Sequence, residues 1–253
     1  MTAQIGITGV AGRMGRALAE FILGENSDCK LVAAVERPES SLIGVDVGEF
    51  LGGEPIKVAV TADLEAVISQ ADVLIDFTVP QATVKYASIC ANMGIPMVVG
   101  TTGFSNGQQA HLARIANIIA ICQASNFSMG VNLGFQLVET AARAIGESVD
   151  IEIIEAHHRD KVDSPSGTAL SLGRIVSSAL GSDFDKVAVF GRQGQTGSRS
   201  RSTIGFSTVR AGDIVGEHTV IFAGEGERLE ITHKASSRMA FASGAVLAAC
   251  WVA

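Results

Sequence analysis

The sequence predicts an α/β protein of two domains: an N-terminal parallel sheet covered by helices, and a second α+β domain built on a mainly antiparallel sheet. Three observations predict this class. Strand and helix patterns alternate early in the chain, a glycine-rich turn follows the first strand, and strand-like runs joined by short turns come late. We expect residues 1–127 to form the first domain, completed by the returning segment 239–253, and residues 128–238 to form the second.

The first elements form a strand, a turn, a helix and a second strand. Residues 4–8 are short, apolar and β-branched, and they lead directly into GVAGRMG. Apolar side chains then recur at helical spacing, at Met14, Ala17, Leu18, Phe21 and Ile22. Residues 30–35 read as a second buried strand that ends at Glu36. This order is a βαβ unit of the usual length.

The glycine turn predicts a Rossmann-type dinucleotide site. Gly9, Gly12 and Gly15 lack the side chains that would keep a pyrophosphate away from the helix N-terminus. Their G-x-x-G-x-x-G spacing is weak alone, because tight strand–helix packing also selects glycine. Glu36 strengthens it, since a carboxylate at the end of the second strand can accept from ribose hydroxyls. Arg37 could pair with a 2′-phosphate, so we expect both NADH and NADPH to be used.

The first domain continues with further strands and helices. We expect strands over 73–78, 97–99 and 118–122 and helices over 83–92 and 108–116. In parallel sheets ligands lie beyond the carboxyl ends of the strands. The small polar loops GTTG and ASNF follow two of these ends and could line the nicotinamide side, although ordinary turns have the same composition.

The second domain is expected to begin with a helix over 131–145 and a strand over 151–156. A helix then starts with Ser164 as N-cap and Pro165 at its first position. Strands follow over 204–209, 218–222 and 229–232, and an apolar helix over 241–252 returns to the first domain. The loop 191–203 carries three arginines and no acid, which suits a surface loop or a lid over an anionic substrate.

The segment EAHHRDKVDSPSGTA gathers proton carriers and cations beside a helix start. His157, His158 and Lys161 precede the first N–H groups of that helix, at 166–168. Unpaired N–H groups at a helix start suit a carboxylate. We therefore predict a site for a small carboxylated molecule in which His157 and Lys161 move protons. The alternative is a solvated loop of charged residues before an ordinary capped helix.

Composition excludes several other classes. The formal net charge is −7, from 19 basic and 26 acidic residues, which argues against nucleic acid or an anionic membrane as partner. No apolar run is long enough for a membrane helix, and no signal peptide is readable. The four cysteines suggest neither a disulfide framework nor a metal site. We expect a cytoplasmic protein with reduced thiols and no metal.

These motifs together resemble the 4-hydroxy-tetrahydrodipicolinate reductase (dihydrodipicolinate reductase) family over essentially the whole chain. The resemblance runs from GVAGRMG through EAHHRDKVDSPSGTA and IGFSTVRAGDIVGEH to LEITHKASSRMAFASGA. It implies NAD(P)H-dependent reduction of the cyclic product of aspartate semialdehyde and pyruvate, a small dicarboxylate, in lysine and diaminopimelate biosynthesis. It also implies a homotetramer assembled through the C-terminal sheets.

The resemblance further implies roles for individual residues. His157 would be the general acid/base and Lys161 the proton donor, while His158, Gly167 and Thr168 would hold the substrate carboxylates. Asp160 lies at a variable position of the motif and leaves the division between His157 and Lys161 open. The implied cofactor contacts are Gly9, Val10, Ala11, Gly12, Arg13, Met14, Glu36, Arg37, Gly100, Thr101, Thr102, Ala124, Ser125, Asn126 and Phe127.

Two other functions compete with this one. Another two-domain dehydrogenase, acting on an amino acid or a sugar, would have no need of paired histidines before Ser-Gly-Thr. A redox-sensing protein that binds NAD(H) without catalysis would have no need of Lys161. A nucleic-acid module is the weakest alternative, because of the negative charge.

Overall fold

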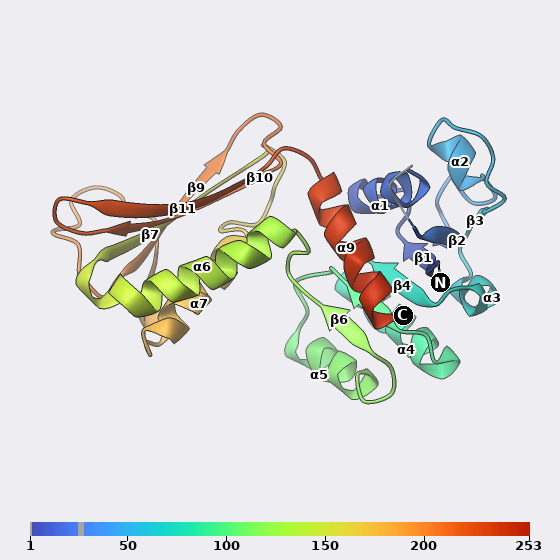
Figure 1. Cartoon of the computed structure of the whole chain (residues 1–253), viewed down its shortest axis with the longest axis horizontal. Coiled ribbons are helices and arrows are strands. Elements are labelled where there is room, and N and C mark those ends of the chain that lie inside the picture. The colour runs from blue at the N-terminus through green and yellow to red at the C-terminus, as the bar shows by residue number, and fades with distance from the viewer. Residues whose placement is uncertain (1, 25–27) are drawn as a thin grey trace. The chain divides into compact units, whose positions relative to one another are not determined.

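The computed structural model describes residues 2–24 and 28–253 and divides the chain into two compact units. Unit 1 comprises residues 1–128 and 238–253, and unit 2 comprises residues 129–237. Each unit has its own sheet (Figure 1). Each also has its own apolar core.

Unit 1 is built on a parallel sheet with the strand order β3-β2-β1-β4-β5-β6. This is the strand order of Rossmann folds. The chain adds β2 and β3 on one side of β1 and then β4, β5 and β6 on its other side. The strands are β1 (Gln4–Thr8), β2 (Lys30–Val35), β3 (Val60–Thr61), β4 (Val73–Asp76), β5 (Met97–Val99) and β6 (Ile121–Gln123). The helices are α1 (Arg13–Leu23), α2 (Val47–Phe50), α3 (Leu64–Val67), the 3-10 helix η1 (Ile68–Gln70), α4 (Pro80–Met93), α5 (Asn106–Ile115) and α9 (Met239–Val252).

The C-terminal helix α9 is part of the core of unit 1. Ala242, Ala245, Val246 and Ala249 are buried in the same cluster as Ile5, and α9 lies beside α1 and β4 (Figure 1). Burial of about 25 cal/mol per Å² of apolar surface drives this docking. The C-terminal helix therefore packs against elements of the first sheet.

Two elements of unit 1 begin three residues away from their sequence-based starts. β6 begins at Ile121 rather than Ile118, because residues 117–119 still turn back onto the end of α5, where the Ile118 N–H donates to the Ile115 carbonyl. Helix α4 begins at Pro80, three residues before the predicted start. Proline is favoured in a first helical turn, where its missing N–H costs nothing.

Unit 2 has a mixed sheet with the strand order β11-β10-β7-β9-β8. Its strands are β7 (Asp150–His157), β8 (Ala188–Phe190), β9 (Ile204–Arg210), β10 (Gly216–Ala223) and β11 (Arg228–Ala235). Its helices are α6 (Met129–Ile145), the 3-10 helix η2 (Gly146–Ser148), α7 (Gly167–Ala179) and α8 (Phe184–Val187). Side chains from α6 and α7 share an apolar cluster with one face of this sheet.

The position of β9 corrects a sequence-based expectation. The run of late strands was expected to pair consecutively and antiparallel, but β9 pairs in parallel with β7 and with β8. β10 pairs antiparallel with β7 and β11, so it lies on the other side of β7 from β9. β7 lies between β9 and β10, so it has a parallel neighbour on one side and an antiparallel neighbour on the other.

The arginine-rich loop 191–203 is tied to β7. Arg192 and Arg199 both pair with the carboxylate of Glu152, at 2.9 and 2.8 Å, and Arg199 also pairs with Asp150 at 2.7 Å. Arg199 donates in addition to the carbonyls of Ile151 and Thr203. Both arginines are therefore paired with carboxylates of β7. This favours a surface loop over a lid that brings charge to an anionic substrate.

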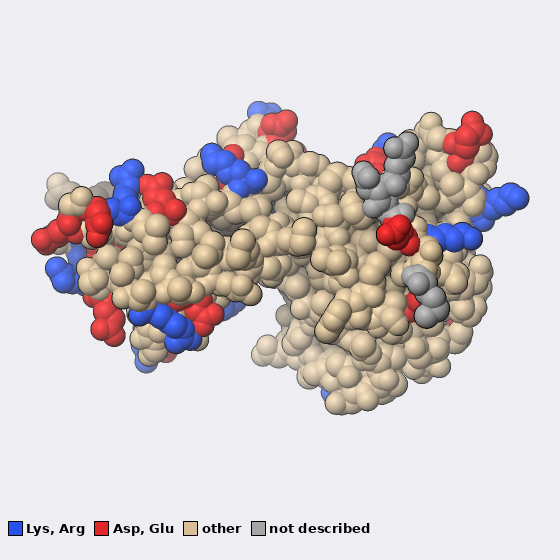
Figure 2. Space-filling view, in the orientation of Figure 1, with Lys and Arg blue, Asp and Glu red and all other residues tan. Residues whose placement is uncertain are grey.

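The last features concern the charged surface of unit 2 and the hydropathy of the helices. On the face seen in Figure 2, basic and acidic side chains of unit 2 are interspersed. Within the described residues, no helix combines the length and the apolar character needed to cross a bilayer.

Candidate functional site

The glycine turn of unit 1 lies where β1 passes into α1. Gly9 has a φ of +66°, a left-handed conformation that costs other residues energy, and its N–H donates to the Val35 carbonyl at 2.8 Å. Gly12 is the N-cap residue of α1 and offers no side chain to the first turn, which also contains no acidic residue. The start of α1 therefore suits an anionic group such as a pyrophosphate.

Gly15 has a different role from the one its spacing indicates. A Cβ at Gly15 would lie 2.1 Å from the Gly9 carbonyl oxygen, whereas a Cβ at Gly12 would lie 3.1 Å from the same atom. Gly15 is thus required for close packing of α1 against the turn. The packing alternative holds for this glycine, and the approach of a phosphate concerns Gly9 and Gly12.

Glu36 is fixed by the same turn. Its Oε1 accepts from the Ala11 N–H at 2.8 Å, its Oε2 accepts from the Arg37 N–H at 3.1 Å, and the residue is 9% exposed. Arg37 is exposed beside it. A carboxylate oxygen accepts more than one hydrogen bond, so this arrangement is compatible with ribose hydroxyls at the same carboxylate.

A buried carboxylate connects β1, β4 and the loop after β5. Asp76, the last residue of β4, is fully buried. Its Oδ1 accepts from the hydroxyls of Thr8 at 2.6 Å and Thr78 at 2.7 Å, and its Oδ2 accepts from Thr83 and, at 3.2 Å, from Thr101. These contacts hold Thr8, which precedes Gly9, and Thr101 of the GTTG loop.

Two further predicted cofactor segments are shaped by close packing. A Cβ at Gly100 would lie 2.0 Å from the Phe77 ring, and Thr102 follows as an exposed residue. Phe127 packs edge-on against Phe77 at 5.7 Å, and its carbonyl oxygen approaches α9 where a Cβ at Gly244 would lie 1.8 Å away.

The loop between β6 and α6 holds the remaining predicted contacts. The Ala124 N–H donates to the Val99 carbonyl at 3.1 Å, and the Asn126 side chain accepts from the Ser128 N–H at 2.8 Å. With Ser125, they follow the carboxyl end of β6, at the same edge of the sheet as the glycine turn. The structure brings the predicted cofactor residues of unit 1 to one edge.

In unit 2 the second set of predicted residues begins at the end of β7. Alternate residues of β7 face the helices: Ile151 and Ile153 are in the apolar core, and Glu155 and His157 follow on the same face. The register places Glu155 opposite Thr208 of β9 and His218 of β10. One face of the sheet is therefore apolar at one end and polar at the other.

Glu155 is the centre of this polar end. Its side chain is 1% exposed; its Oε2 lies 2.6 Å from His157 Nδ1, and Arg210 donates to both carboxylate oxygens at 2.8 Å. Oε1 also accepts from the Ser166 N–H at 3.1 Å. Burial opposes ionisation, but the hydrogen bonds and charges of His157 and Arg210 outweigh it and lower the pKa of Glu155 to about 2.

Lys161 and the start of α7 lie beside this cluster in the chain. Lys161 Nζ donates to Asp163 Oδ1 at 2.8 Å. The backbone N–H of Lys161 donates to the His158 carbonyl at 3.2 Å. The N-cap of α7 is Ser166 rather than the predicted Ser164, because Ser166 Oγ accepts from the Ala169 N–H and Ser166 N–H is used by Glu155. The helix therefore begins at Gly167, which is exposed, and Thr168, which is buried.

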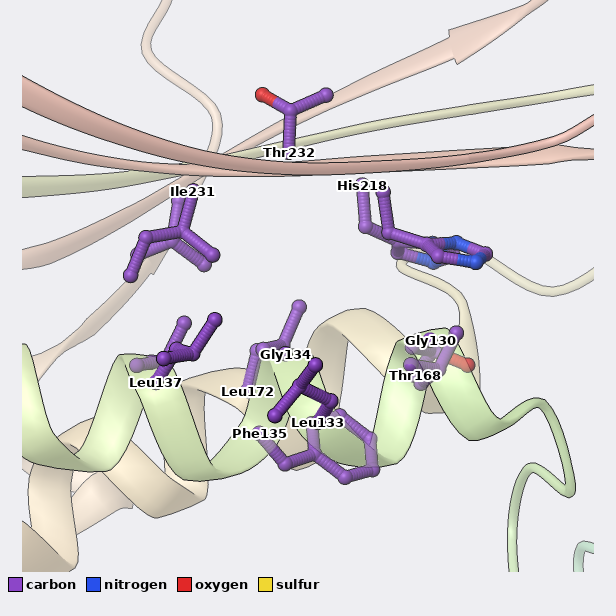
Figure 3. A pocket seen from close by; sticks show the side chains of 14 residues that line it. Gly130, Leu133, Gly134, Phe135, Leu137, Thr168, Leu172, His218, Ile231 and Thr232 are labelled. Atoms are coloured by element: carbon purple, nitrogen blue, oxygen red, sulfur yellow. The ribbon is translucent and has the colours of Figure 1, made fainter.

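A cavity of about 260 Å³ lies inside unit 2, between α6 and the strands β10 and β11. Its lining is mostly apolar, with Leu133 and Ile231 on opposite walls, and Thr168 and His218 lie at one end (Figure 3). His218 Nε2 lies 2.9 Å from Ser166 Oγ, and its ring packs edge-on against that of His157 at 5.1 Å. The cavity thus borders the predicted carboxylate site.

We expect His218 to make the stability of unit 2 depend on pH. Burial, and then the charge of His157, lower the pKa of His218 to about 4. The unfolded chain, with an ordinary pKa of about 6.5, binds the proton more readily, so His218 contributes fully above that pH and loses its contribution as pH falls toward 4. The loss amounts to at most about 3 kcal/mol.

The measurement is urea unfolding between pH 7.5 and pH 4.5, on the parent and on His218→Gln. The variant should show a smaller loss of unfolding free energy with falling pH. Identical pH dependence in the two proteins would contradict the assignment.

Several residues of these sites were missed by sequence reasoning. Glu155, Arg210 and His218 hold or flank His157, Asp163 pairs with Lys161, and Asp76 organises the strand ends of unit 1. For Glu155 a signal existed, since it continues the alternation of Ile151 and Ile153.

Residues 3–127 match the family described as dihydrodipicolinate reductase, N-terminus, and residues 130–253 match dihydrodipicolinate reductase, C-terminus. A 4-hydroxy-tetrahydrodipicolinate reductase from Alkalilimnicola ehrlichii is 58% identical over 253 residues, covering 100% of this chain and 94% of the relative. One from Saccharophagus degradans is 56% identical over 252 residues, with the same coverage.

Solved structures agree with these matches. A dipicolinate-bound dihydrodipicolinate reductase from Paenisporosarcina sp. TG-14 superposes with a TM-score of 0.77 at 25% identity, covering 100% of this chain and 95% of that one. An amine dehydrogenase from Mycobacterium smegmatis shares the fold, with a TM-score of 0.63 at 16% identity, covering 100% of this chain and 92% of that one.

Proposed function

The chain belongs to the dihydrodipicolinate reductase family, and on that premise we propose how its residues divide the work of an NAD(P)H-dependent reductase. The substrate is 4-hydroxy-tetrahydrodipicolinate, and the product is tetrahydrodipicolinate, in the diaminopimelate route to lysine. Unit 1 binds the dinucleotide and unit 2 binds the substrate.

Bound NADH or NADPH supplies the hydride. The glycine turn fits the pyrophosphate, because the start of α1 has neither a side-chain cap nor an acidic residue. Glu36 accepts from the ribose and Arg37 meets a 2′-phosphate, so both cofactors are used. The remaining predicted contacts lie at the strand ends of the same sheet, at Gly100, Thr101 and Thr102 and in the loop 124–127.

His157 and Lys161 take part in the proton transfer that follows hydride addition. Hydride addition to a conjugated ring imine leaves electron density that must be protonated at the neighbouring carbon, and a nearby cation stabilises that charge. The observation that carries this proposal is the geometry of His157 at the end of β7, with Nδ1 held 2.6 Å from a buried carboxylate. Lys161 follows four residues later as the accompanying cation.

The start of α7 holds the substrate carboxylates. Gly167 leaves the first N–H groups of the helix accessible, Thr168 adds a hydroxyl, and His158 contributes from the end of β7. A dipicolinate-bound relative has a ligand with two carboxylates, which supports the same chemistry here.

Assembly and location complete the proposal. Ile154 and Val209 are exposed on the face of the unit 2 sheet that α6 and α7 leave uncovered, at 37% and 44%. Such a face suits pairing with other copies, and we expect a homotetramer in the cytoplasm. Analytical ultracentrifugation distinguishes a tetramer from a dimer.

The test of the function is nicotinamide absorbance, with substrate generated in place by a synthase from pyruvate and aspartate semialdehyde. We expect decay with NADH and with NADPH that requires both precursors. A folded protein that binds NADH but shows no such decay would contradict the proposed reaction, and a preference above about a thousandfold for one cofactor would contradict dual use.

A further inference from the structure

Glu155 of β7 is held by residues of two other elements, β9 and the start of α7. It is buried, Arg210 holds it from β9 with two hydrogen bonds of 2.8 Å, and Ser166 holds it from the start of α7. Thr208 adds a weaker contact at 3.3 Å. Arg210 and Ser166 therefore hold the carboxylate in addition to its contact with His157.

The contact between Glu155 and His157 determines which ring nitrogen of His157 is available for proton transfer. An ionised carboxylate only accepts hydrogen bonds, so Nδ1, 2.6 Å from Oε2, must carry a proton. Nε2 is then the atom that gives or takes the catalytic proton. The space beside Nε2 is kept by Gly216, where a Cβ would approach that nitrogen to 3.1 Å.

We propose that Glu155 is the positioning residue of the acid/base group, and that it keeps His157 in the tautomer with Nδ1–H and with Nε2 directed past Gly216. In the forward reaction, Nε2–H of the imidazolium transfers its proton to the substrate carbon next to the reduced centre. The neutral ring keeps Nδ1–H on Glu155, and Nε2 regains a proton from solvent. Glu155 itself takes no proton. This inference rests on the proposed function of His157.

The first test measures the tautomer in the unaltered chain. In ¹⁵N-histidine-labelled protein at neutral pH, the His157 signal, assigned by its loss in His157→Gln, should show a protonated Nδ1. A bare Nδ1 in the neutral ring would overturn the proposal without any variant of Glu155.

The second test is Glu155→Gln, which keeps the shape of the side chain but offers an amide that can also donate to Nδ1. We expect kcat to fall at least about tenfold, with KM for substrate and NADH within about threefold, and a mixture of His157 tautomers. Thr208→Val is the matched control, because it removes one weak contact of Glu155 and leaves its charge. The control should keep most of the parental kcat.

The outcomes separate the two proposals. Parental turnover in His157→Gln means that the function proposed for His157 is wrong. Loss of turnover in His157→Gln with parental turnover in Glu155→Gln means that the positioning role is wrong. If Glu155→Gln does not fold, Glu155→Asp preserves the charge opposite Arg210 and withdraws the oxygens from Nδ1, and the same fall in kcat is expected.

A separate observation concerns two cysteines of unit 1. Cys29 precedes β2, Cys250 lies in the last turns of α9, and they are 221 residues apart in the chain. Their sulfur atoms lie 3.0 Å apart, and both are thiols. A disulfide bond measures about 2.05 Å, so the sulfurs need to close by only about 1 Å. The spacing of the cysteines along the chain does not indicate this pair.

The structure assigns Cys29 and Cys250 as an oxidisable pair that links α9 to the entrance of β2. Cys250 is exposed and can attack a small disulfide such as oxidised glutathione, which forms a mixed disulfide and releases one glutathione thiol. Cys29 then attacks that mixed disulfide and releases the second glutathione. The two protein thiols lose their hydrogens as protons, and the glutathione disulfide is reduced.

The other cysteines provide an internal comparison. Burial, with a contribution from Asp76, raises the pKa of Cys90 to about 12, and burial also raises the pKa of Cys122. A thiol with a raised pKa has little of the reactive thiolate. We therefore expect oxidised glutathione to react with Cys29 and Cys250 before it reacts with Cys90 or Cys122.

The experiment treats the full chain with oxidised glutathione and maps peptides by mass spectrometry. We expect a Cys29–Cys250 crosslink, two thiols lost by titration, and a stable glutathione adduct on Cys250 in Cys29→Ser. Cys90→Ser is the control and should form the same crosslink. Recovery of all four thiols, or of adducts without the crosslink in the parent chain, would overturn the assignment.

Discussion

Replacing Lys161 with alanine is expected to lower kcat by about 10²- to 10⁴-fold, because proton transfer from His157 then lacks the cation that stabilises the charge left by hydride addition. Lys161 is 21% exposed and is paired with Asp163, so its charge is partly shielded from water beside the polar end of the unit 2 sheet. Dinucleotide affinity should stay within about twofold, because the predicted cofactor residues belong to unit 1. Steady-state kinetics and NADH fluorescence titration measure both quantities.

Lys186→Ala is the matched control for this prediction. Lys186 belongs to the same unit, is 81% exposed, and pairs with Asp183 at 3.4 Å. Its loss should leave kcat unchanged. A Lys161→Ala protein that keeps more than a third of the parental kcat would show that Lys161 is not the cation that assists proton transfer. His157→Gln, measured in parallel, would then determine whether the histidine acts alone.

The start of unit 1 was predictable because its signals are local, whereas α2, β3, α3 and η1 were not predicted. The strand, the glycine turn, the helix and Glu36 follow one another in about thirty residues, and the bounds of β1, β2 and β5 agree with the sequence pattern. The failure at β6 has a local cause as well. Ile118 continues the apolar run in the sequence, but it belongs to the turn that ends α5.

The polar end of unit 2 was only partly predictable. His157 and Lys161 are recognisable from neighbouring letters, and alternation along β7 places Glu155 on the buried face. The donors to Glu155 are not recognisable in this way, because Arg210 lies 55 residues later and reaches it through the parallel pairing of β9 with β7. A long-range register of this kind has no signature in local periodicity.

The position of the α7 cap shows how tertiary contacts decide between equal local choices. Ser164 and Ser166 are both good N-cap residues. The Ser166 N–H is taken by Glu155, and Ser166 Oγ lies beside His218, so the helix starts two residues later than the sequence suggests. The prediction of Ser164 was wrong because the buried carboxylate of Glu155, which fixes Ser166, has no local signal at the cap.

Asp76→Ala is expected to lower the free energy of unfolding of unit 1 by about 3 kcal/mol or more. Hydrogen bonds to a charged group contribute about 1.5–3 kcal/mol each, and the threonine hydroxyls left without their acceptor are buried. KM for NADH should rise about tenfold, because Thr8 and Thr101 then lose the contact that holds the glycine turn and the GTTG loop.

Asp72→Ala is the matched control, since Asp72 lies just before the other end of β4 and is exposed. Its carboxylate accepts one hydrogen bond, from the Gln4 N–H at 2.8 Å, so its loss should cost less than about 1 kcal/mol. Urea unfolding and NADH kinetics on both variants check the pair. Equal small losses in the two proteins would mean that the threonines find other acceptors. A destabilised Asp76→Ala with parental KM for NADH would mean that the carboxylate supports the sheet without positioning the cofactor loops.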